Sequence, residues 1–357
     1  MYTVKDDQEG NTMKAIAYEK YGSADVLELK EVRKPEIEGD RLLVRILAAS
    51  ANPYDWHFMR GVPYIARPAA MGVRKPNHTL LGSDVAGEVE AVGNAVTRFR
   101  PGDEVFGFVG EGGFAEYVSA PERLLALKPT NLSFEQAATV PLAAVTALQG
   151  LRDAGEIRSG EKVLIVGASG GVGTFAVQIA KWYGAQVTGV CSTRNLEMVR
   201  SIGADQVIDY TQEDFTRTGQ RYDLIFQLAG TTAPLAFRRV LTPKGRLVLS
   251  SGDSPGRVIG PVGRIIKAML LSPFIGGQTM RPFVAKASSD DLQFLRELIE
   301  TGRVTPVIDR TYPLSEAADA IRYLETGRAR GKVVISVSAA PTANTTRVGS
   351  PRAMAAE

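Results

Sequence analysis

The sequence is poor in the residues that build metal sites and disulfides. It contains one cysteine, Cys191, and two histidines, His57 and His78, among 357 residues. One cysteine excludes an internal disulfide and a four-cysteine structural zinc site, and two histidines leave a His/Cys catalytic zinc site short of ligands. We therefore expect chemistry that does not depend on a bound metal ion.

Long apolar runs and a strong charge of one sign are also missing. No run reaches the ~18–20 residues that span a bilayer, and residues 1–12 lack the apolar stretch of a secretory signal. The 42 Lys plus Arg nearly balance the 39 Asp plus Glu, so we expect no nucleic-acid partner and no integral membrane segment. We expect flexible ends at 1–12 and 339–357, and a cytoplasmic location.

The chain changes character near residue 140. Before this point, short β-type runs alternate with Gly, Pro, Asn and Asp, which favours an antiparallel, barrel-like β domain. After it, strands alternate with helices, which indicates βαβ units and a parallel sheet, so the fold class is α/β. The predicted strands are 13–18, 41–50, 86–92, 104–107, 115–118, 162–166, 186–191, 206–210, 222–228, 246–250 and 332–337; the predicted helices lie within 134–153, 174–183, 195–202, 234–241, 290–301 and 315–326.

The most specific motif is a glycine loop between the predicted strand 162–166 and the helix that follows it. Its glycines recur every three residues, with one more between them. A sharp turn needs a residue without Cβ, a pyrophosphate needs close backbone approach, and the helix N-terminus offers unpaired N–H groups. The loop therefore predicts a dinucleotide site made by Gly167, Ser169, Gly170, Gly171, Val172 and Gly173.

The ends of the later strands extend this predicted cofactor site. An acid at the end of strand 186–191 would bind the ribose of NAD, but Ser192, Thr193 and Arg194 stand there. Hydroxyl groups and a guanidinium suit a 2′-phosphate, so we predict NADPH in preference to NADH, with Arg194 as the discriminating residue. Ligands of such sheets bind beyond the strand ends, which adds Tyr210, Ala229, Gly230, Ser250 and Ser251.

Further segments show a resemblance to a known family. The chain from about 13 to 337 resembles the medium-chain dehydrogenase/reductase superfamily, and within it the zinc-free quinone oxidoreductase (zeta-crystallin-like) branch. The resemblance implies a GroES-like β-barrel catalytic domain at 13–140 and 305–338, a Rossmann NADP-binding domain at 141–304, an active site between them and a homodimer. The segments that carry it, besides the glycine loop, are Ala51-Asn52-Pro53-Tyr54-Asp55, Leu81 to Val89, Arg100 to Val105, Ala137 to Pro141 with Thr146-Ala147, and Gly331-Lys332-Val333-Val334.

The same resemblance implies roles for individual residues. The zinc-dependent branch carries ligands where this chain has Asn52 and Ser83. As hydrogen-bond donors to a substrate oxygen it suggests Asn52 and Tyr54, with Tyr64 where related enoyl reductases place a tyrosine. It places Thr146 beside the nicotinamide and lets Lys332 reach the cofactor.

A site without a Lewis-acid metal favours acceptors that spread negative charge themselves. We therefore predict an NADPH-dependent reductase of quinones or α,β-unsaturated carbonyls with a small hydrophobic substrate. Two alternatives stay open: an enoyl-thioester reductase, and a catalytically weak NADPH-binding sensor or structural protein. The spacing of apolar residues in the cationic segment 254–283 favours an amphipathic helix. Four interpretations of this helix stay open: a buried helix at the cleft between the domains, a lid over the substrate, a dimer contact, or a helix on a membrane surface.

Overall fold

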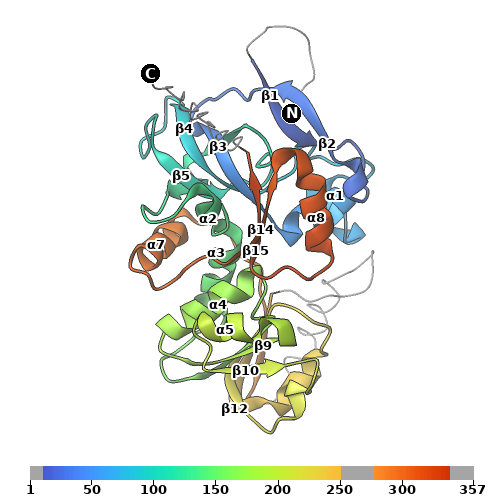
Figure 1. The fold of residues 1–357 in the computed structure, drawn as a ribbon, viewed down its shortest axis with the longest axis vertical. Helices are drawn as coiled ribbons and strands as arrows, with labels where there is room; N and C mark the ends of the chain where they lie inside the picture. The colour runs from blue at the N-terminus through green and yellow to red at the C-terminus, as the bar shows by residue number, and fades with distance from the viewer. Residues whose placement is uncertain (1–10, 251–276, 338–357) are drawn as a thin grey trace, which may run out of the picture.

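The computed structural model describes residues 11–250 and 277–337, and these residues form two large sheets with helices between and around them (Figure 1). Ser251 and most of the segment 254–283 lie outside the described residues. The end of that segment, Thr279–Pro282, is a strand and not part of a helix. Within the described ranges, no helix has the length and apolar character needed to cross a bilayer.

The seven-stranded sheet combines the β-rich first part of the chain with its end. Its order is β14-β15-β3-β4-β5-β7, with β6 paired to β3, and β1 and β2 form a separate pair. All neighbours are antiparallel except β14 and β15, which bring the end of the chain back to this sheet. The bounds are β1 (Thr12–Ala17), β2 (Glu28–Arg33), β3 (Arg41–Ala51), β4 (Asp84–Val92), β5 (Glu104–Phe108), β6 (Tyr117–Pro121), β7 (Leu125–Leu127), β14 (Ile308–Pro313) and β15 (Lys332–Ser336).

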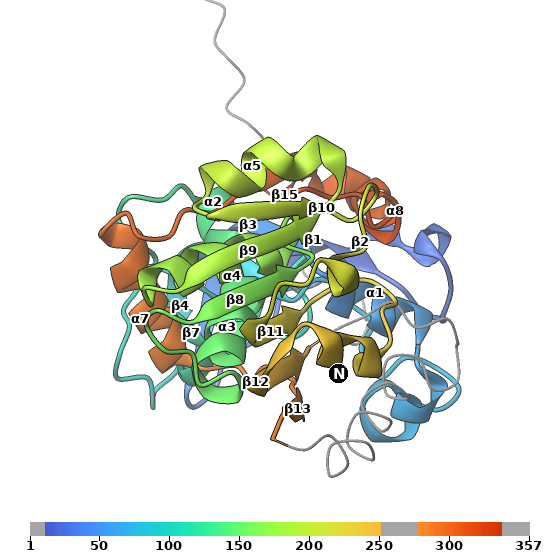
Figure 2. The ribbon, with the colours of Figure 1, turned by 90° about the horizontal axis from the view of Figure 1, so that it is seen from below.

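The six-stranded sheet is entirely parallel, and its strands lie side by side as a twisted fan in Figure 2. Counted along the chain, its order is 3-2-1-4-5-6, the order of a doubly wound dinucleotide-binding fold. The first two strands have the predicted bounds, and each is buried after its first residue. The strands are β8 (Lys162–Val166), β9 (Gln186–Cys191), β10 (Gln206–Asp209), β11 (Tyr222–Gln227), β12 (Leu241–Leu249) and β13 (Thr279–Pro282).

Most predicted helices form, but 234–241 is only a 3₁₀ turn at Pro234–Arg239. The stretch 134–153 holds two helices, and Pro141 starts the second. A helix that was not predicted, α1, follows β3; the Asp55 carboxylate caps it by accepting from the Asn52 N–H at 2.7 Å. The helices are α1 (Pro53–Arg60), α2 (Phe134–Ala138), α3 (Pro141–Gln149), α4 (Gly171–Trp182), α5 (Leu196–Ser201), α7 (Ser289–Glu300) and α8 (Ala317–Glu325).

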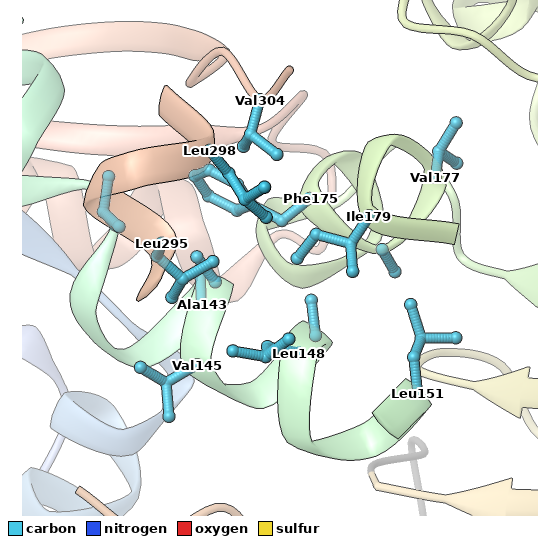
Figure 3. Packing of buried hydrophobic residues seen from close by; sticks show 14 of the residues in the cluster. Ala143, Val145, Leu148, Leu151, Phe175, Val177, Ile179, Leu295, Leu298 and Val304 are labelled. Carbon is cyan, nitrogen blue, oxygen red and sulfur yellow. The ribbon is translucent and has the colours of Figure 1, made fainter. Parts of the chain in front are cut away.

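The largest core cluster lies where α3, α4 and α7 meet (Figure 3). Leu148 of α3, Phe175 of α4 and Leu295 of α7 are completely buried there. Truncation of a buried phenylalanine to alanine costs about 3–5 kcal/mol, so this packing holds α3 firmly against the parallel sheet. The helix that carries Thr146 is therefore fixed relative to the glycine loop.

Candidate active site

Two adjoining cavities lie beside the glycine loop that follows β8. The first has a volume of about 520 Å³ and the second of about 1000 Å³. Gly167, Gly170 and Ala229 line both cavities, and so do Gly327 and Ala329 from the segment that leads into β15. The glycine loop and the returning chain end thus form a common wall between them.

The first cavity is mainly apolar, and both sheets contribute to it. Two of the predicted hydroxyl groups, those of Thr146 on α3 and Ser250 after β12, belong to residues of its lining. Thr146 Oγ1 donates to Leu142 O at 2.6 Å. Such a lining, with few polar groups, suits an apolar ligand that carries one or two polar atoms. Apolar lining residues include Phe108, Leu142, Val145, Leu228 and Val284.

A buried lysine forms part of the wall of the first cavity. Lys332, at the start of β15, is 3% exposed. Its Nζ donates to Asn52 Oδ1, lies 3.5 Å from Ala51 O and lies 3.6 Å from Asp84 Oδ2. The ammonium group therefore points toward the seven-stranded sheet, while the methylene chain passes Gly171, where a Cβ would lie 2.9 Å from Lys332 Cδ.

Asn52 reaches the cavity wall, but its amide hydrogens have acceptors within the protein. Its Nδ2 donates to Asp84 Oδ2 at 2.8 Å, and Ser83 Oγ and Ser50 O lie at 3.3 Å. Its Oδ1 accepts from Lys332. The structure thus makes Asn52 a residue that fixes Lys332, and leaves no Asn52 N–H to donate to a ligand.

Two buried carboxyl groups complete this network. Asp84 Oδ1 accepts from Leu142 N at the start of α3, at 3.0 Å, so the network joins the seven-stranded sheet to α3. Burial raises the pKa of Asp84, against the opposing effect of Lys332. Burial also raises the pKa of Asp55, to about 7, although it accepts from Asn52 N and Ser83. Burial lowers the pKa of Lys332, and the two carboxylates oppose this shift.

The donor set of this network does not fit zinc. Asn52 and Ser83 stand at the positions where the resemblance places zinc ligands, and the Lys332 ammonium lies beside Asn52 Oδ1 and Asp84 Oδ2. A metal cation held there would face a fixed positive charge. Over the described ranges, no group of three or more His, Cys, Asp or Glu residues is arranged to hold a metal. Cys191 is buried at the end of β9.

The structure separates the two tyrosines that were predicted as donors. Tyr54 lines the first cavity, its ring packs against Phe58 and Phe108, and its hydroxyl has no hydrogen-bond partner among the described residues. Burial raises the pKa of Tyr54 to about 12, so the hydroxyl keeps its proton at neutral pH. Tyr64 is 39% exposed, lies against the Arg67 guanidinium and lines neither cavity.

The glycine loop has the shape that a dinucleotide needs. Gly167 has φ +90°, and a Cβ on Gly173 would lie 2.1 Å from Gly167 O, so the turn itself requires these two glycines. Gly170 is different, because its φ is −83° and a Cβ there would come no closer than 3.5 Å to the protein. The fold therefore does not require glycine at position 170. Since Gly170 lines both cavities, the absence of a side chain there leaves room for a ligand.

The second cavity is lined by the residues predicted for the 2′-phosphate, Ser192, Thr193 and Arg194. Tyr210, Ser169 and Gly230 also line it. In this structure, Arg194 Nη2 donates to the backbone carbonyl of Arg328. The acid at the end of β10, Asp209, accepts from Thr193 and Thr211 and is not a lining residue. Gly171, Val172 and Gly173 belong to the first cavity instead.

Sequence reasoning missed two kinds of site residue. Asn195 connects the glycine loop to the residue that follows β9. Its Nδ2 donates to Ser169 Oγ at 3.0 Å and lies 3.3 Å from Ser192 Oγ. Its place directly after Arg194 was an available signal. Arg328 lines the second cavity from a segment more than 130 residues away in sequence. The pairing of β15 with β3 and the Gly331 N–H donated to Ser169 O at 2.9 Å help to bring it there.

A largely antiparallel sheet beside a doubly wound sheet, with two cavities at the glycine loop, is the arrangement of a dinucleotide-dependent oxidoreductase. Comparisons with known proteins agree. The "Alcohol dehydrogenase GroES-like domain" family profile matches residues 38–130, and the "Zinc-binding dehydrogenase" profile matches residues 202–335.

Individual relatives match over nearly the whole chain. The 2-methylene-furan-3-one reductase of Solanum lycopersicum is 38% identical over 90% of this chain and 79% of that protein. The NADPH-dependent alkenal/one oxidoreductase of Arabidopsis thaliana has the same identity and coverage. The solved structure of the quinone oxidoreductase from Coxiella burnetii is 32% identical, with a TM-score of 0.80 over 92% of this chain and all of that one. The chain belongs to the medium-chain dehydrogenase/reductase superfamily, in its quinone oxidoreductase branch.

Proposed function

We propose that this protein is an NADPH-dependent reductase that delivers hydride to a quinone or an α,β-unsaturated carbonyl compound. The observation that carries this proposal is the pair of adjoining cavities, one hydroxyl-rich and basic, the other apolar, which share the glycine loop. The names of relatives at 38% identity support the same reaction class.

The residues of the glycine loop fit NADPH. The open space at Gly170 admits a pyrophosphate beside the N-terminus of α4, where backbone N–H groups and the helix dipole favour negative charge. Ser192, Thr193 and Arg194 offer donors to a 2′-phosphate, and Thr146, Ala229 and Ser250 border the cavity that receives the nicotinamide end. When bound, the nicotinamide supplies the hydride; the chain binds and orients it.

The acceptor occupies the apolar cavity in this proposal. Tyr54 is the donor candidate that the geometry favours, because it lines the cavity and its hydroxyl has no protein partner among the described residues. Tyr64 and Asn52 remain predictions as donors, and their positions do not support that role. The protein works without zinc in this proposal; a metal analysis of the purified protein that found stoichiometric zinc would contradict it.

The decisive experiment follows NADPH oxidation at 340 nm with quinones, enals, enones and enoyl thioesters. We expect turnover with a quinone or a conjugated carbonyl. A clear preference for enoyl thioesters would favour the acyl-reductase alternative, and NADPH binding without turnover of any acceptor would favour a sensor or structural role. The predicted homodimer is tested by the mass of the protein in solution.

The predicted cytoplasmic location is a separate question. Several relatives carry chloroplastic or mitochondrial in their names, so imaging of the tagged protein in its own cell is the appropriate test.

A further inference from the structure

We propose that Asn195 is a positioning residue that makes this protein select NADPH, because its side-chain amide turns the hydroxyl groups of Ser169 and Ser192 toward the 2′-phosphate. This inference rests on the proposed function, which names NADPH as the cofactor. The hydrogen bonds on which it depends belong to the structure without any ligand.

The amide of Asn195 is held between two parts of the cofactor site. Asn195 ends the 3₁₀ turn Thr193–Asn195 after β9 and is 3% exposed. Its Nδ2 donates to Ser169 Oγ in the glycine loop at 3.0 Å and to Ser192 Oγ at 3.3 Å. An amide nitrogen carries two hydrogens, so each serine receives one. A single buried group therefore fixes the two hydroxyl groups relative to each other.

The two serine hydroxyl groups accept from Asn195 and keep their own hydrogens. A serine hydroxyl has one hydrogen and two lone pairs. Among the described residues, neither Ser169 Oγ nor Ser192 Oγ donates to an acceptor of the protein. Both serines line the second cavity, and neither lines the first. Their hydrogens are therefore available to a ligand in the second cavity.

The stability of the fold does not explain the Asn195 amide. Its Oδ1 is buried and has no hydrogen-bond partner in the described part of the chain. A buried polar atom without a partner is unfavourable for folding. The only partners of this side chain among the described residues are the two serines. Its contribution is therefore to the cofactor site, where it sets the direction of their hydrogens.

A phosphate group is the ligand that suits these hydrogens. Phosphate oxygens are strong acceptors, and hydrogen bonds to a charged acceptor are stronger than those between neutral groups. Arg194 lines the same cavity and adds a positive charge. The ribose hydroxyl that NADH carries at this position is neutral, so it gains less from two donors and a cation. The arrangement therefore favours NADPH over NADH.

Asn195→Asp tests the proposal with an almost isosteric change. A carboxylate only accepts hydrogen bonds, so both serines turn their hydrogens toward it, and its charge repels the 2′-phosphate. Loss of each hydrogen bond to a charged group raises Kd roughly 10-fold or more. In fluorescence titrations we expect Kd for NADPH to rise at least about 100-fold, and Kd for NADH to rise less than about threefold.

Two comparisons separate this effect from a general loss of structure. Asn131→Asp is the matched control, because Asn131 Nδ2 donates to Ile299 O outside both cavities, and it keeps both affinities. Asn195→Ala brings no charge but frees the serine hydroxyls to rotate, so it raises Kd for NADPH about tenfold. Thermal unfolding of each apoprotein shows which variants are folded, and Asn195→Ala carries the test if Asn195→Asp is not.

A double-mutant cycle shows whether Asn195 acts through the two serines. In a variant with Ser169→Ala and Ser192→Ala, the further change Asn195→Ala should alter Kd for NADPH less than about twofold, because the groups that it orients are gone. An Asn195→Ala effect of the same size with and without the serines would refute the proposal. Equal changes in Kd for NADPH and NADH would refute it too.

Turnover separates this proposal from the proposed function. A wild type that reduces a quinone or an enone, together with an Asn195→Asp variant of unchanged cofactor preference, refutes the role of Asn195 alone. A wild type that reduces no acceptor, together with the expected loss of NADPH affinity in Asn195→Asp, refutes the proposed reductase activity alone.

Discussion

Gly170→Ala is the sharpest perturbation of the cofactor loop, because the fold tolerates it and the ligand does not. The new Cβ lies 3.5 Å from its nearest protein atom, and φ is −83°. Alanine caps a helix less well than glycine but also reduces the entropy of the unfolded chain, by about 0.4–1 kcal/mol. These effects oppose each other, so we expect a change in unfolding free energy of about 1 kcal/mol or less.

The effect of Gly170→Ala on NADPH binding is larger. A methyl group at the point of closest backbone approach displaces the pyrophosphate from its N–H donors. Each hydrogen bond to a charged group contributes about 1.5–3 kcal/mol, so the loss of one raises Kd for NADPH roughly 10–100-fold. Fluorescence titration with NADPH and thermal unfolding of the apoprotein measure the two effects separately.

Another glycine of the same loop, Gly173, provides the control. Gly173→Ala places a Cβ 2.1 Å from Gly167 O and 2.8 Å from the Ala168 backbone. This variant must shift α4, so we expect a loss of stability as well as of binding. Wild-type affinity in Gly170→Ala, or equal destabilisation of the two variants, would refute the reasoning that the open space at Gly170 belongs to the ligand.

Three further predictions concern other parts of the molecule. Arg194→Ala should raise KM for NADPH about tenfold, which corresponds to a loss of ~1.4 kcal/mol of binding free energy. KM for NADH should stay unchanged, and an unaltered cofactor preference would contradict the assignment. Tyr54→Phe should lower kcat with an enone about 10²-fold, whereas Tyr64→Phe should change it less than threefold; equal effects would remove the distinction between them. Burial raises the pKa of Asp55 to about 7 in the folded protein, whereas the unfolded chain releases this proton near pH 4. The stability that this group contributes is therefore full below pH 4 and is lost as the pH rises to about 7, so the melting temperature should fall over this range. Asp55→Asn should abolish this fall, and an equal fall in both proteins would disprove the assignment.

Local patterns predicted every strand of the parallel sheet except β13. The apolar run of β8, the glycine loop after it and the strand β9 can be recognised from adjacent residues. By contrast, β2 and β7 escaped prediction, because Glu28–Arg33 is largely exposed and Leu125–Leu127 is only three residues long. These strands are held by their pairing, β2 with β1 and β7 with β5, which local sequence patterns do not display.

The residues of the candidate site also differ in how far the sequence could predict them. Ser192, Thr193 and Arg194 could be placed at the cofactor because they directly follow a strand whose end faces it. Lys332 was predicted to reach the cofactor, but the contact of its ammonium with Asn52 was not predicted, because it depends on where β15 pairs with β3. Tyr64 is adjacent to the predicted active-site loop in sequence but lies outside both cavities.

The return of the chain end to the glycine loop has a consequence for synthesis. Gly327, Ala329 and Lys332 close walls that residues before 305 leave incomplete, and Gly331 bonds directly to Ser169. A chain still attached to the ribosome folds its early part first, yet it has no finished cofactor site until residue 332 has emerged. Premature termination upstream of this segment would therefore yield a protein with an assembled parallel sheet and no competent catalytic pocket.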